Sequence, residues 1–359
     1  VVVNVVCLFV CVCVCGVPKQ FGYRVAGSCV SPGPTIRLQP GASYRLVLRN
    51  GATEMTNLHT HGVHVIGDGN GDDITRTVAP GDCLAYHWVM RNDQPAGTYW
   101  YHAHHQGSTD AQVSGGALGL LVVEDSAAAL GLASQDPRAL WLNAAHERAV
   151  LGASINGAFT GNGVVGGASL PLVANEWYRL RVAISEPGGG GGSLVVGPAC
   201  EARPVTHDGV WRFAVPGAPM DALQLSGSSR VDLAIRCSAS DVVSYSGSNI
   251  ALLQVSAGTN TAATPFTASG ATWAPVRGPA VRDLRSDSVP ASNHQSIKMT
   301  ASQIAGLSWD PQVGLGNINF GQVHEWTISG SNAHPFHLHL YHMQVNKRCC
   351  CWSWFCFCS

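Results

Sequence analysis

Residues 41–49 of this 359-residue chain read Gly-Ala-Ser-Tyr-Arg-Leu-Val-Leu-Arg, and residues 175–182 repeat the pattern as Asn-Glu-Trp-Tyr-Arg-Leu-Arg-Val, 134 residues further along. A weaker third copy, Gly-Gln-Val-His-Glu-Trp-Thr-Ile, occupies residues 321–328, 146 residues after the second. Each copy is rich in the aromatic and branched residues that favour strands. The spacing fits one sandwich domain per copy. The repeat therefore predicts an all-β chain of tandem β-sandwich domains.

Short runs of the same character alternate with turns rich in glycine, proline, asparagine and aspartate, as in sandwiches and barrels. Two stretches of small residues, near 125–136 and 258–272, divide the chain. The predicted domains are 19–125, 137–257 and 272–346, and the third is too short to be complete. The one helix expected is the Ala-rich stretch Ser126–Leu132 in the first linker.

The composition argues against two classes of function. Lys+Arg total 21 and Asp+Glu total 22, a net charge of −1, so the chain lacks the basic surplus that binds nucleic acid. No uncharged apolar run reaches the roughly 18 residues that a membrane-spanning helix needs. We therefore expect neither a nucleic-acid partner nor a membrane span.

Most of the 13 cysteines lie in Val-Cys repeats before residue 16 and in a run after residue 348. The chain starts with valine, and an alternating G/T dinucleotide repeat in DNA would encode the alternation of valine and cysteine in residues 10–15. Residues 1–18 and 347–359 are therefore expected to be unstructured or artefactual, and no signal peptide is readable. Pairing of Cys200 with Cys237, and of Cys29 with Cys83, is possible. Four cysteines allow three connectivities, so the pairing stays open.

Three His-x-His pairs stand out among the 15 histidines, where random placement predicts fewer than one: His59/His61, His102/His104 and His337/His339. Residues i and i+2 of a strand point to the same face, so each pair presents two imidazoles side by side. Imidazole suits zinc, copper, iron and nickel. Two pairs lie in the first predicted domain and one in the third, which predicts a metal cluster at their interface. His64 is a weaker candidate ligand.

Four segments carry a resemblance to a known family. They are Pro-Gly-Pro-Thr-Ile-Arg-Leu-Gln-Pro-Gly at 32–41, Asn-Leu-His-Thr-His-Gly at 57–62, Gly-Thr-Tyr-Trp-Tyr-His-Ala-His at 97–104 and Asn-Ala-His-Pro-Phe-His-Leu-His at 332–339. Together they resemble the multicopper oxidases, which include laccases, ferroxidases and bilirubin oxidases. The resemblance spans residues 28–346 and is weak in the second unit. It implies that residues 107–121 form a strand returning across the first domain.

The resemblance implies cupredoxin-like domains, which are antiparallel Greek-key sandwiches, with a trinuclear copper cluster between the first and third. It implies that His59 and His337 hold the type 2 copper. The type 3 pair would take the other four histidines of the three pairs: His61, His102, His104 and His339. His334 matches a ligand of a separate type 1 copper. The implied reaction couples one-electron oxidation of a small reducing substrate, such as a phenol or metal ion, to reduction of O₂ to water outside the cytoplasm.

The sequence departs from the family at the last motif. In the family a His-Cys-His motif supplies the type 1 thiolate, on which blue-copper sites depend, and the remaining cluster ligands. No such motif follows His339. The type 1 site is therefore expected to be incomplete, and the chain to be a C-terminally truncated product. The main alternative to an oxidase is a non-catalytic copper-binding cupredoxin remnant.

Two smaller features complete the set. Asp-Gly-Asn-Gly-Asp-Asp at residues 68–73 is spaced like the start of a calcium loop but lacks the distal glutamate. Its Asp72 and Asp73 are candidate proton donors to the cluster. His59, His61 and His64 also resemble a zinc hydrolase motif of the metallo-β-lactamase type, although Val63 stands where that motif has aspartate. The strand–helix alternation of such a hydrolase is missing, so this function is less favoured.

Overall fold

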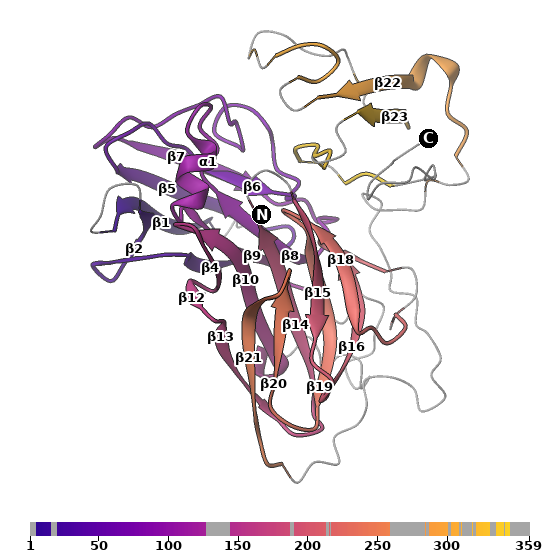
Figure 1. Ribbon diagram of the computed structural model, residues 1–359. Helices are drawn as coiled ribbons and strands as arrows, with labels where there is room; N and C mark the ends of the chain where they lie inside the picture. The colour runs from indigo at the N-terminus through magenta and orange to yellow at the C-terminus, as the bar shows by residue number, and fades with distance from the viewer. Residues whose placement is uncertain are drawn as a thin grey trace.

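The computed structural model describes residues 5–15, 20–126, 144–186, 190–212, 215, 217–258, 284, 287–300, 303–308, 310, 318, 321–330, 335–340 and 342–344. The described residues are almost entirely in strands and connecting turns, with one α-helix, α1 (Thr109–Ser114), and two short 3₁₀ turns, Ala144–His146 and Ala291–Asn293. Two β-sandwiches occupy most of the molecule, and a smaller β unit follows them (Figure 1). The predicted all-β fold is thus confirmed.

The first sandwich packs a five-stranded sheet, in the order β3-β2-β1-β5-β7, against a four-stranded sheet, in the order β4-β9-β8-β6. The bounds of its strands are β1 Val5–Val14, β2 Phe21–Val25, β3 Ser28–Val30, β4 Gly33–Leu38, β5 Ser43–Gly51, β6 His59–His61, β7 Cys83–Val89, β8 Gly97–His102 and β9 Leu118–Val123.

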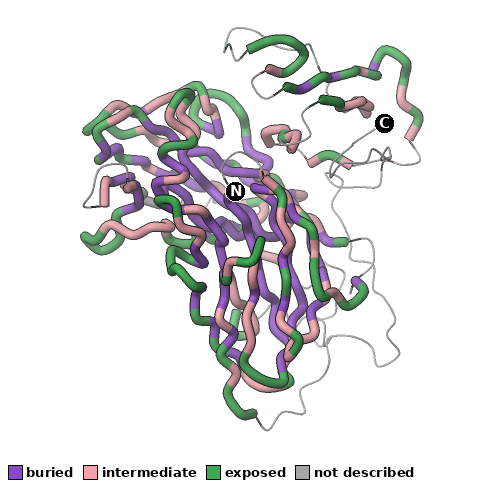
Figure 2. The backbone as a smooth tube through the Cα atoms, viewed as in Figure 1, coloured by how far each residue is buried: buried purple, intermediate pink, exposed green. Residues whose placement is uncertain are grey.

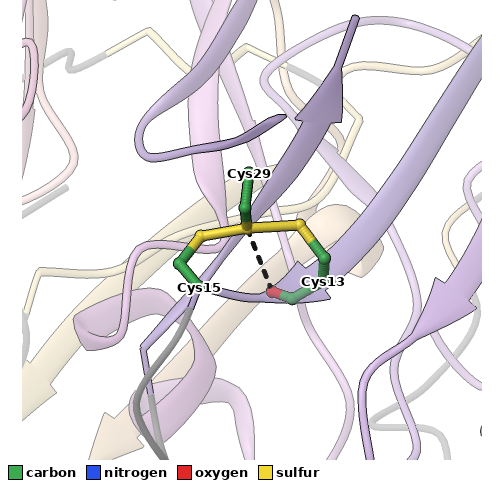
Figure 3. A group of neighbouring side chains, drawn as sticks. All are labelled: Cys13, Cys15 and Cys29. Atoms are coloured by element: carbon green, nitrogen blue, oxygen red, sulfur yellow. Dashed lines mark hydrogen bonds between the residues drawn. A yellow bond between two sulfur atoms is a disulfide. The ribbon is translucent and has the colours of Figure 1, made fainter. Parts of the chain in front are cut away.

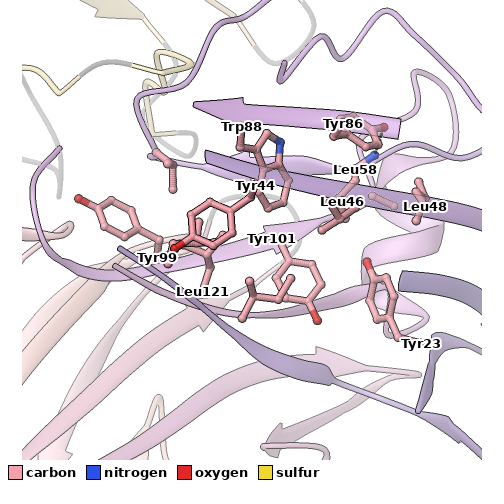
Figure 4. Packing of buried hydrophobic residues seen from close by; sticks show 14 of the residues in the cluster. Tyr23, Tyr44, Leu46, Leu48, Leu58, Tyr86, Trp88, Tyr99, Tyr101 and Leu121 are labelled. Carbon is pink, nitrogen blue, oxygen red and sulfur yellow. Dashed lines mark hydrogen bonds between the residues drawn. The ribbon is translucent and has the colours of Figure 1, made fainter. Parts of the chain in front are cut away.

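The core of this sandwich is built by period-two alternation along its strands. In β5, Tyr44, Leu46 and Leu48 are buried, whereas Arg45 and Arg49 are exposed. The buried side chains of β5 meet those of the facing sheet in one aromatic-rich cluster (Figure 4). Because successive side chains of a strand alternate between faces, the pattern fixes which face of β5 lies inward.

The second sandwich packs a seven-stranded sheet, in the order β12-β11-β10-β14-β19-β16-β17, against a five-stranded sheet, in the order β13-β21-β20-β15-β18. Its strands are β10 Glu147–Ile155, β11 Ala158–Gly161, β12 Val164–Val165, β13 Ala168–Val173, β14 Trp177–Ser185, β15 Gly191–Val196, β16 Cys200–His207, β17 Val210–Trp211, β18 Ala222–Ser226, β19 Arg230–Cys237, β20 Asp241–Tyr245 and β21 Ser248–Ser256.

The repeated sequence motif occupies equivalent places in the two sandwiches. β5 pairs parallel with β1 and antiparallel with β7, and β14 pairs parallel with β10 and antiparallel with β19. The hydroxyl of Tyr44 accepts a hydrogen bond from the backbone N–H of Gln39, and that of Tyr178 accepts one from Val173. In both cases the donor lies five residues earlier. The repeat therefore preserves a hydrogen bond as well as a strand.

The third copy of the motif belongs to a two-stranded parallel pair. It lies in β23 (Glu325–Gly330), which pairs with β22 (His294–Met299). β5 and β14 likewise pair in parallel, with β1 and with β10 respectively. Most described residues of this unit are half-buried or exposed (Figure 2).

β14 joins the two sandwiches. All nine of its residues are buried. One face of the strand lies in the core of the second sandwich, while Ala183 on the other face packs with Trp100 and Leu120 of the first. The β14 arginines lie on this same face, Arg179 between Asp125 and Asp232 and Arg181 beside Glu147. The interface thus buries these charged side chains as ion pairs.

Three expectations from the sequence need correction. Residues 5–14 are not outside the fold, because they form β1, where alternating valines suit a strand and Val12 is fully buried. Residues 107–121 are not one strand, since α1 and a turn precede β9. The sandwiches are mixed rather than purely antiparallel. The expected helix at Ser126–Leu132 and most of both predicted linkers lie outside the described residues.

The cysteine pairing is partly as expected. Cys200 and Cys237 form a disulfide between the paired strands β16 and β19, which confirms that proposed pair. The possible Cys29–Cys83 pair is wrong. Cys83 is a free, exposed cysteine on β7, whereas Cys29 on the edge strand β3 lies at disulfide distance from Cys13 and Cys15 (Figure 3). The sequence interval between Cys29 and Cys83 carries no information about this strand order.

Candidate metal centre

The first two histidine pairs are brought together by the pairing of β6 with β8. The register places His59 opposite His102 and His61 opposite Trp100. His59 and His61 share one face of β6, as the spacing predicts. His104 lies two residues beyond the end of β8, and its backbone N–H donates to Asn57 Oδ1 at 2.7 Å. The short strand β6 and the end of β8 therefore present four imidazoles from one sheet.

The third pair, on the segment 335–340, completes the group. The His339 ring stacks on His59 with centroids 4.2 Å apart, and the His337 ring stacks on His61 at 4.0 Å. His104 lies 5.0 Å from His339 and 5.1 Å from His59 between ring centroids. The six predicted histidines of the three pairs thus meet in one place, although 235 residues separate His102 from His337 along the chain.

Three of the six come closest to the arrangement of a single metal site. Ligating nitrogens of His59, His61 and His337 all lie within 4.8 Å of one another. His59 and His61 are buried, while His337 is exposed at the edge of the group. A metal ion at this point would be enclosed by protein on one side and reachable from the other.

Asp72 fixes the orientation of His59. His59 Nδ1 donates to Asp72 Oδ2 at 2.7 Å, and the backbone N–H of Thr60 donates to Asp72 Oδ1 at 3.1 Å. Both side chains of the His59–Asp72 pair are completely buried. Because Nδ1 is engaged, Nε2 is the nitrogen left with a lone pair. This buried Nε2 has no hydrogen-bond partner among the described residues.

His102 is oriented by its own backbone. Its Nδ1 donates to the carbonyl oxygen of Ala103 at 2.9 Å, which leaves the lone pair on Nε2. That Nε2 lies 3.4 Å from His61 Nδ1. The indole of Trp100 stacks on both rings, at 4.2 Å from His102 and 4.9 Å from His61. The rings are therefore held in place by packing as well as by hydrogen bonds.

Burial sets the protonation of the group. Burial, followed by the neighbouring imidazoles, lowers the pKa of His59 and of His102 well below the usual 6.5. Burial is also the main cause that lowers the pKa of His339 to about 4. The same effect on a carboxyl group has the opposite sign, so burial raises the pKa of Asp72 to about 7. At neutral pH these imidazoles are neutral, which is the form that binds metal.

The weaker sequence candidates lie elsewhere. His64 turns away from His59 and His61, and its Nε2 lies 2.6 Å from His342 Nδ1. The three histidines of the less favoured zinc motif therefore do not converge. Asp73 accepts hydrogen bonds from the backbone N–H and the hydroxyl of Thr75. His334 lies outside the described residues.

In the loop at residues 68–73, which is spaced like the start of a calcium site, the Arg76 side chain binds two of the loop's oxygen atoms. The guanidinium group of Arg76 donates to the carbonyl oxygen of Gly69 at 2.8 Å and also to Asn70 Oδ1. A cationic side chain therefore takes the oxygens that a calcium ion would need. The missing distal glutamate was the sequence signal for this outcome.

Three contributors to the site were not predicted from the sequence: Trp100, Asn57 and His342. Trp100 lies opposite His61 in the strand register, and only the pairing of β6 with β8 reveals this. His342 follows His339 at an interval of three, so the histidine spacing could have drawn attention to it. Its Nε2 donates to the carbonyl oxygen of Asp208 at 2.9 Å. His342 thus links the segment that carries His337 and His339 to both sandwiches.

Fold and site together define a chain of tandem cupredoxin-like sandwiches with a cluster of six histidines, three of them buried. Two family models, both described as multicopper oxidase, match residues 22–128 and 275–349. The chain belongs to the multicopper oxidase family. The first match contains His59, His61, His102 and His104, and the second contains His337 and His339.

Curated relatives match a limited part of the chain. An iron transport multicopper oxidase of Candida glabrata is 35% identical over 99 residues, which cover 26% of this chain and 15% of that protein. A multicopper oxidase of Staphylococcus haemolyticus is 35% identical over 94 residues, 26% of this chain and 20% of that protein. A cell division protein of Xenorhabdus nematophila is 34% identical over 93 residues, 26% of this chain and 19% of that protein.

Solved structures support the fold over nearly the whole chain. A multi-copper oxidase from Pediococcus acidilactici superposes with a TM-score of 0.70 at 17% identity, covering 92% of this chain and 71% of that one. A laccase-like multi-copper oxidase from an Ochrobactrum species gives 0.67 at 19% identity, covering 92% and 80%. The cupredoxin-like architecture is therefore shared, and no helix of the described residues is long and apolar enough to cross a membrane.

Proposed function

We propose that this chain is a copper-binding oxidoreductase that couples one-electron oxidation of a small reducing substrate to the reduction of O₂ to water. The observation that carries the proposal is the buried His59 Nε2, which has no hydrogen-bond partner among the described residues and faces a group of five other imidazoles. A buried polar atom without a partner is costly, so such an atom is expected to have a ligand.

The donor set fits copper. His59 and the five imidazoles that it faces are neutral at pH 7, and no carboxylate among the described residues is grouped with them as a possible metal ligand. Imidazole is a ligand that copper shares with zinc, iron and nickel. Family membership favours copper among these metals. In our proposal His59 and His337 hold the type 2 copper, while the type 3 pair takes His61, His102, His104 and His339. His334 would be a type 1 ligand.

Bound copper would supply the one-electron chemistry that reduces O₂, and the protein residues prepare the site for it. Asp72 holds the His59 ring so that Nε2 points at the group, and the Ala103 carbonyl does the same for His102. Trp100 covers two of the rings and excludes water from that side. Asp72, with a pKa raised by burial to about 7, is the candidate to hold a proton beside His59.

A location outside the cytoplasm is part of the proposal. The Cys200–Cys237 disulfide supports it, because structural disulfides persist in oxidising compartments and are rare in the cytosol. Some relatives of the family are named for iron transport, which is consistent with a metal ion as one possible reducing substrate.

A second candidate function is a copper-binding protein without oxidase activity. One observation favours it. A relative with similar identity is named a cell division protein rather than an oxidase.

Metal competition combined with oxygen uptake separates these functions. The full chain is offered equal copper and zinc, dialysed, analysed for metal and then mixed with ascorbate in an oxygen electrode. Retained copper with oxygen uptake above that of the His59→Ala variant supports the oxidase. Retained copper with uptake equal to that variant supports the non-catalytic protein, and retention of zinc in place of copper contradicts both.

A further inference from the structure

A positively charged side chain of the second sandwich lies beside the histidine group of the first. Arg230 is the first residue of β19, and its backbone pairs with Ala183 of the interface strand β14. Its guanidinium group lies against Gly62, the residue after His61, since a Cβ atom at Gly62 would be 2.7 Å from Arg230 Nη2. The φ of Gly62 is +91°, so the backbone conformation and the close approach both require glycine.

The charge of Arg230 is buried and only partly compensated. The residue is 6% exposed. Its Nη1 donates to the Ser228 carbonyl oxygen at 3.0 Å and its Nη2 to the Asp208 carbonyl oxygen at 3.2 Å, and these acceptors carry no net charge. Its buried Nε has no hydrogen-bond partner among the described residues. The Asp208 carboxylate lies 3.1 Å from Nη1, but that side chain is 39% exposed, so water screens its charge more than that of the arginine.

The histidines near Arg230 respond to its charge. Burial is the main cause of the low pKa of His61 and of His337, and the positive charge of Arg230 lowers the pKa of both further. At His342, where burial again dominates, the charge of Arg230 lowers the pKa by more than the charge of Asp208 raises it. At the histidine group the Arg230–Asp208 pair therefore acts as a cation.

We propose that Arg230 favours Cu(I) over Cu(II) at the histidine group and so raises the reduction potential of copper bound there. The inference rests on the proposed function, since it takes copper as the bound metal. Repulsion between Arg230 and a bound ion grows with the charge of the ion, so Cu(II) is repelled twice as strongly as Cu(I) at the same place. Arg230 acts through its charge and is not a ligand. The second sandwich thus contributes to a site whose histidines all lie outside it.

Metal affinity in variants of different charge tests the proposal. The full chain is first treated with iodoacetamide, because thiols bind soft metal ions. Affinities for Cu(II) and, separately, for Zn²⁺ are then measured against a competing chelator, and only binding that is lost in His59→Ala is counted. Arg230→Gln should bind both ions about tenfold more tightly than the wild-type chain, whereas Arg230→Lys keeps the charge and should stay within about twofold.

Asp208→Asn should change affinity in the opposite direction. It removes the negative charge beside Arg230 but keeps an oxygen for the Arg230 backbone N–H, which donates to Asp208 Oδ1 at 2.9 Å. We expect both ions to bind about threefold more weakly, because the lost carboxylate is partly screened. If Arg230 and Asp208 only held the fold together, both variants would bind more weakly, so opposite signs identify an electrostatic role.

Arg236→Gln is the matched control. It removes the same charge from the same strand, six residues further along β19, where Arg236 is partly exposed and pairs with Glu201. Strand geometry places it about 20 Å from Arg230. Its affinities for Cu(II) and Zn²⁺ should equal those of the wild-type chain.

A redox measurement on the copper-loaded, alkylated chain tests the effect on potential without turnover. The ratio of Cu(II) to Cu(I) is determined from the copper X-ray absorption edge at a fixed ratio of ferricyanide to ferrocyanide under nitrogen. We expect this ratio to be about fivefold higher in Arg230→Gln than in the wild-type chain, and unchanged in Arg236→Gln.

Four results would overturn the proposal. They are Cu(II) and Zn²⁺ affinities of Arg230→Gln no higher than those of the wild-type chain, an equal gain in Arg230→Lys, undiminished affinity in Asp208→Asn, and an unchanged ratio of Cu(II) to Cu(I) in Arg230→Gln. Failure of the proposed function gives a different pattern. The wild-type chain would then retain Zn²⁺ in place of copper, while Zn²⁺ affinity would still rise in Arg230→Gln and fall in Asp208→Asn.

Discussion

Asp72 Oδ2 accepts the Nδ1 proton of His59 at 2.7 Å, and neither side chain is exposed to solvent. The pair spans 13 residues and two different segments, the strand β6 and the loop that follows it. A carboxylate in this position fixes both the tautomer and the direction of the imidazole, and it raises the basicity of the free nitrogen.

This relationship predicts that Asp72 controls metal affinity. Asp72→Ala should weaken copper binding by about 10–100-fold, since the His59 ring loses its fixed orientation. Asp72→Asn keeps an oxygen acceptor and should recover part of the affinity. Asp73→Asn is the matched control, because Asp73 binds Thr75 and should leave affinity unchanged. Copper titrations against a competing chelator measure all three, and equal affinities for Asp72→Ala and Asp73→Asn would contradict the assignment.

The His64–His342 pair predicts a pH dependence for the segment that carries the third histidine pair. Burial lowers the pKa of His64 to about 3 and that of His342 to about 4, both below the usual 6.5. A group whose pKa falls on folding contributes stability above its unfolded pKa and loses it as the pH falls. The docking of residues 335–340 and 342–344 should therefore weaken between about pH 6.5 and 4.

Hydrogen exchange of peptides covering this segment, in the metal-free chain, measures that effect. Exchange corrected for its intrinsic rate should rise as the pH falls from 7 to 5. His342→Ala should exchange fast at both values, and His87→Ala, which changes an exposed residue of β7, should behave as the wild-type chain does. Corrected exchange that does not change with pH in the wild-type chain would refute the anchoring role.

The buried charge group between the sandwiches predicts a large stability effect. Burial opposes ionisation of Asp232, but Arg179 and Arg181 outweigh it and hold the pKa of Asp232 below its usual value. Asp232→Ala leaves buried guanidinium groups short of a partner and should cost about 3–5 kcal/mol of unfolding free energy. Arg203→Ala removes a partly exposed pair with Glu201 and should cost less than about 1 kcal/mol. Denaturant unfolding compares them, and similar losses would argue against the buried network.

The disulfide between β16 and β19 predicts a redox-dependent stability. The double variant Cys200→Ser, Cys237→Ser should lose about 2–4 kcal/mol of unfolding free energy. Cys83→Ser should change it by less than about 0.5 kcal/mol, because Cys83 is free and exposed. A reductant should lower the melting temperature of the wild-type chain by more than that of the double variant, which keeps only the bonding between Cys29 and its neighbours Cys13 and Cys15. Insensitivity of the wild-type chain to reductant would mean that the bond does not form.

The sequence predicted the elements of this fold whose information is local. Repeats containing Tyr44 and Tyr178 identified equivalent strands, and period-two spacing placed His59 and His61 on one face. The partners of these residues depend on long-range register instead. Trp100 becomes a neighbour of His61 only through the β6–β8 pairing. Cys29 on β3 comes near Cys13 on β1 only through the strand order, in which both β1 and β3 pair with β2.

The exclusion of β1 was wrong for a related reason. An argument about how the Val-Cys repeat is encoded says nothing about its conformation, and alternating β-branched residues favour a strand whatever their origin. In contrast, the convergence of three histidine pairs was predicted from their number and spacing, because a metal cluster needs many ligands from few short segments.

In the proposed function, histidines from three separate segments hold copper together. Copper per chain after dialysis is to be measured in the wild-type chain, in His59→Ala, in His337→Ala and in the exposed control His87→Ala. The wild-type chain and His87→Ala should retain equal copper, and His59→Ala and His337→Ala should each retain less. Equal copper in all four chains would refute a copper site shared by these segments.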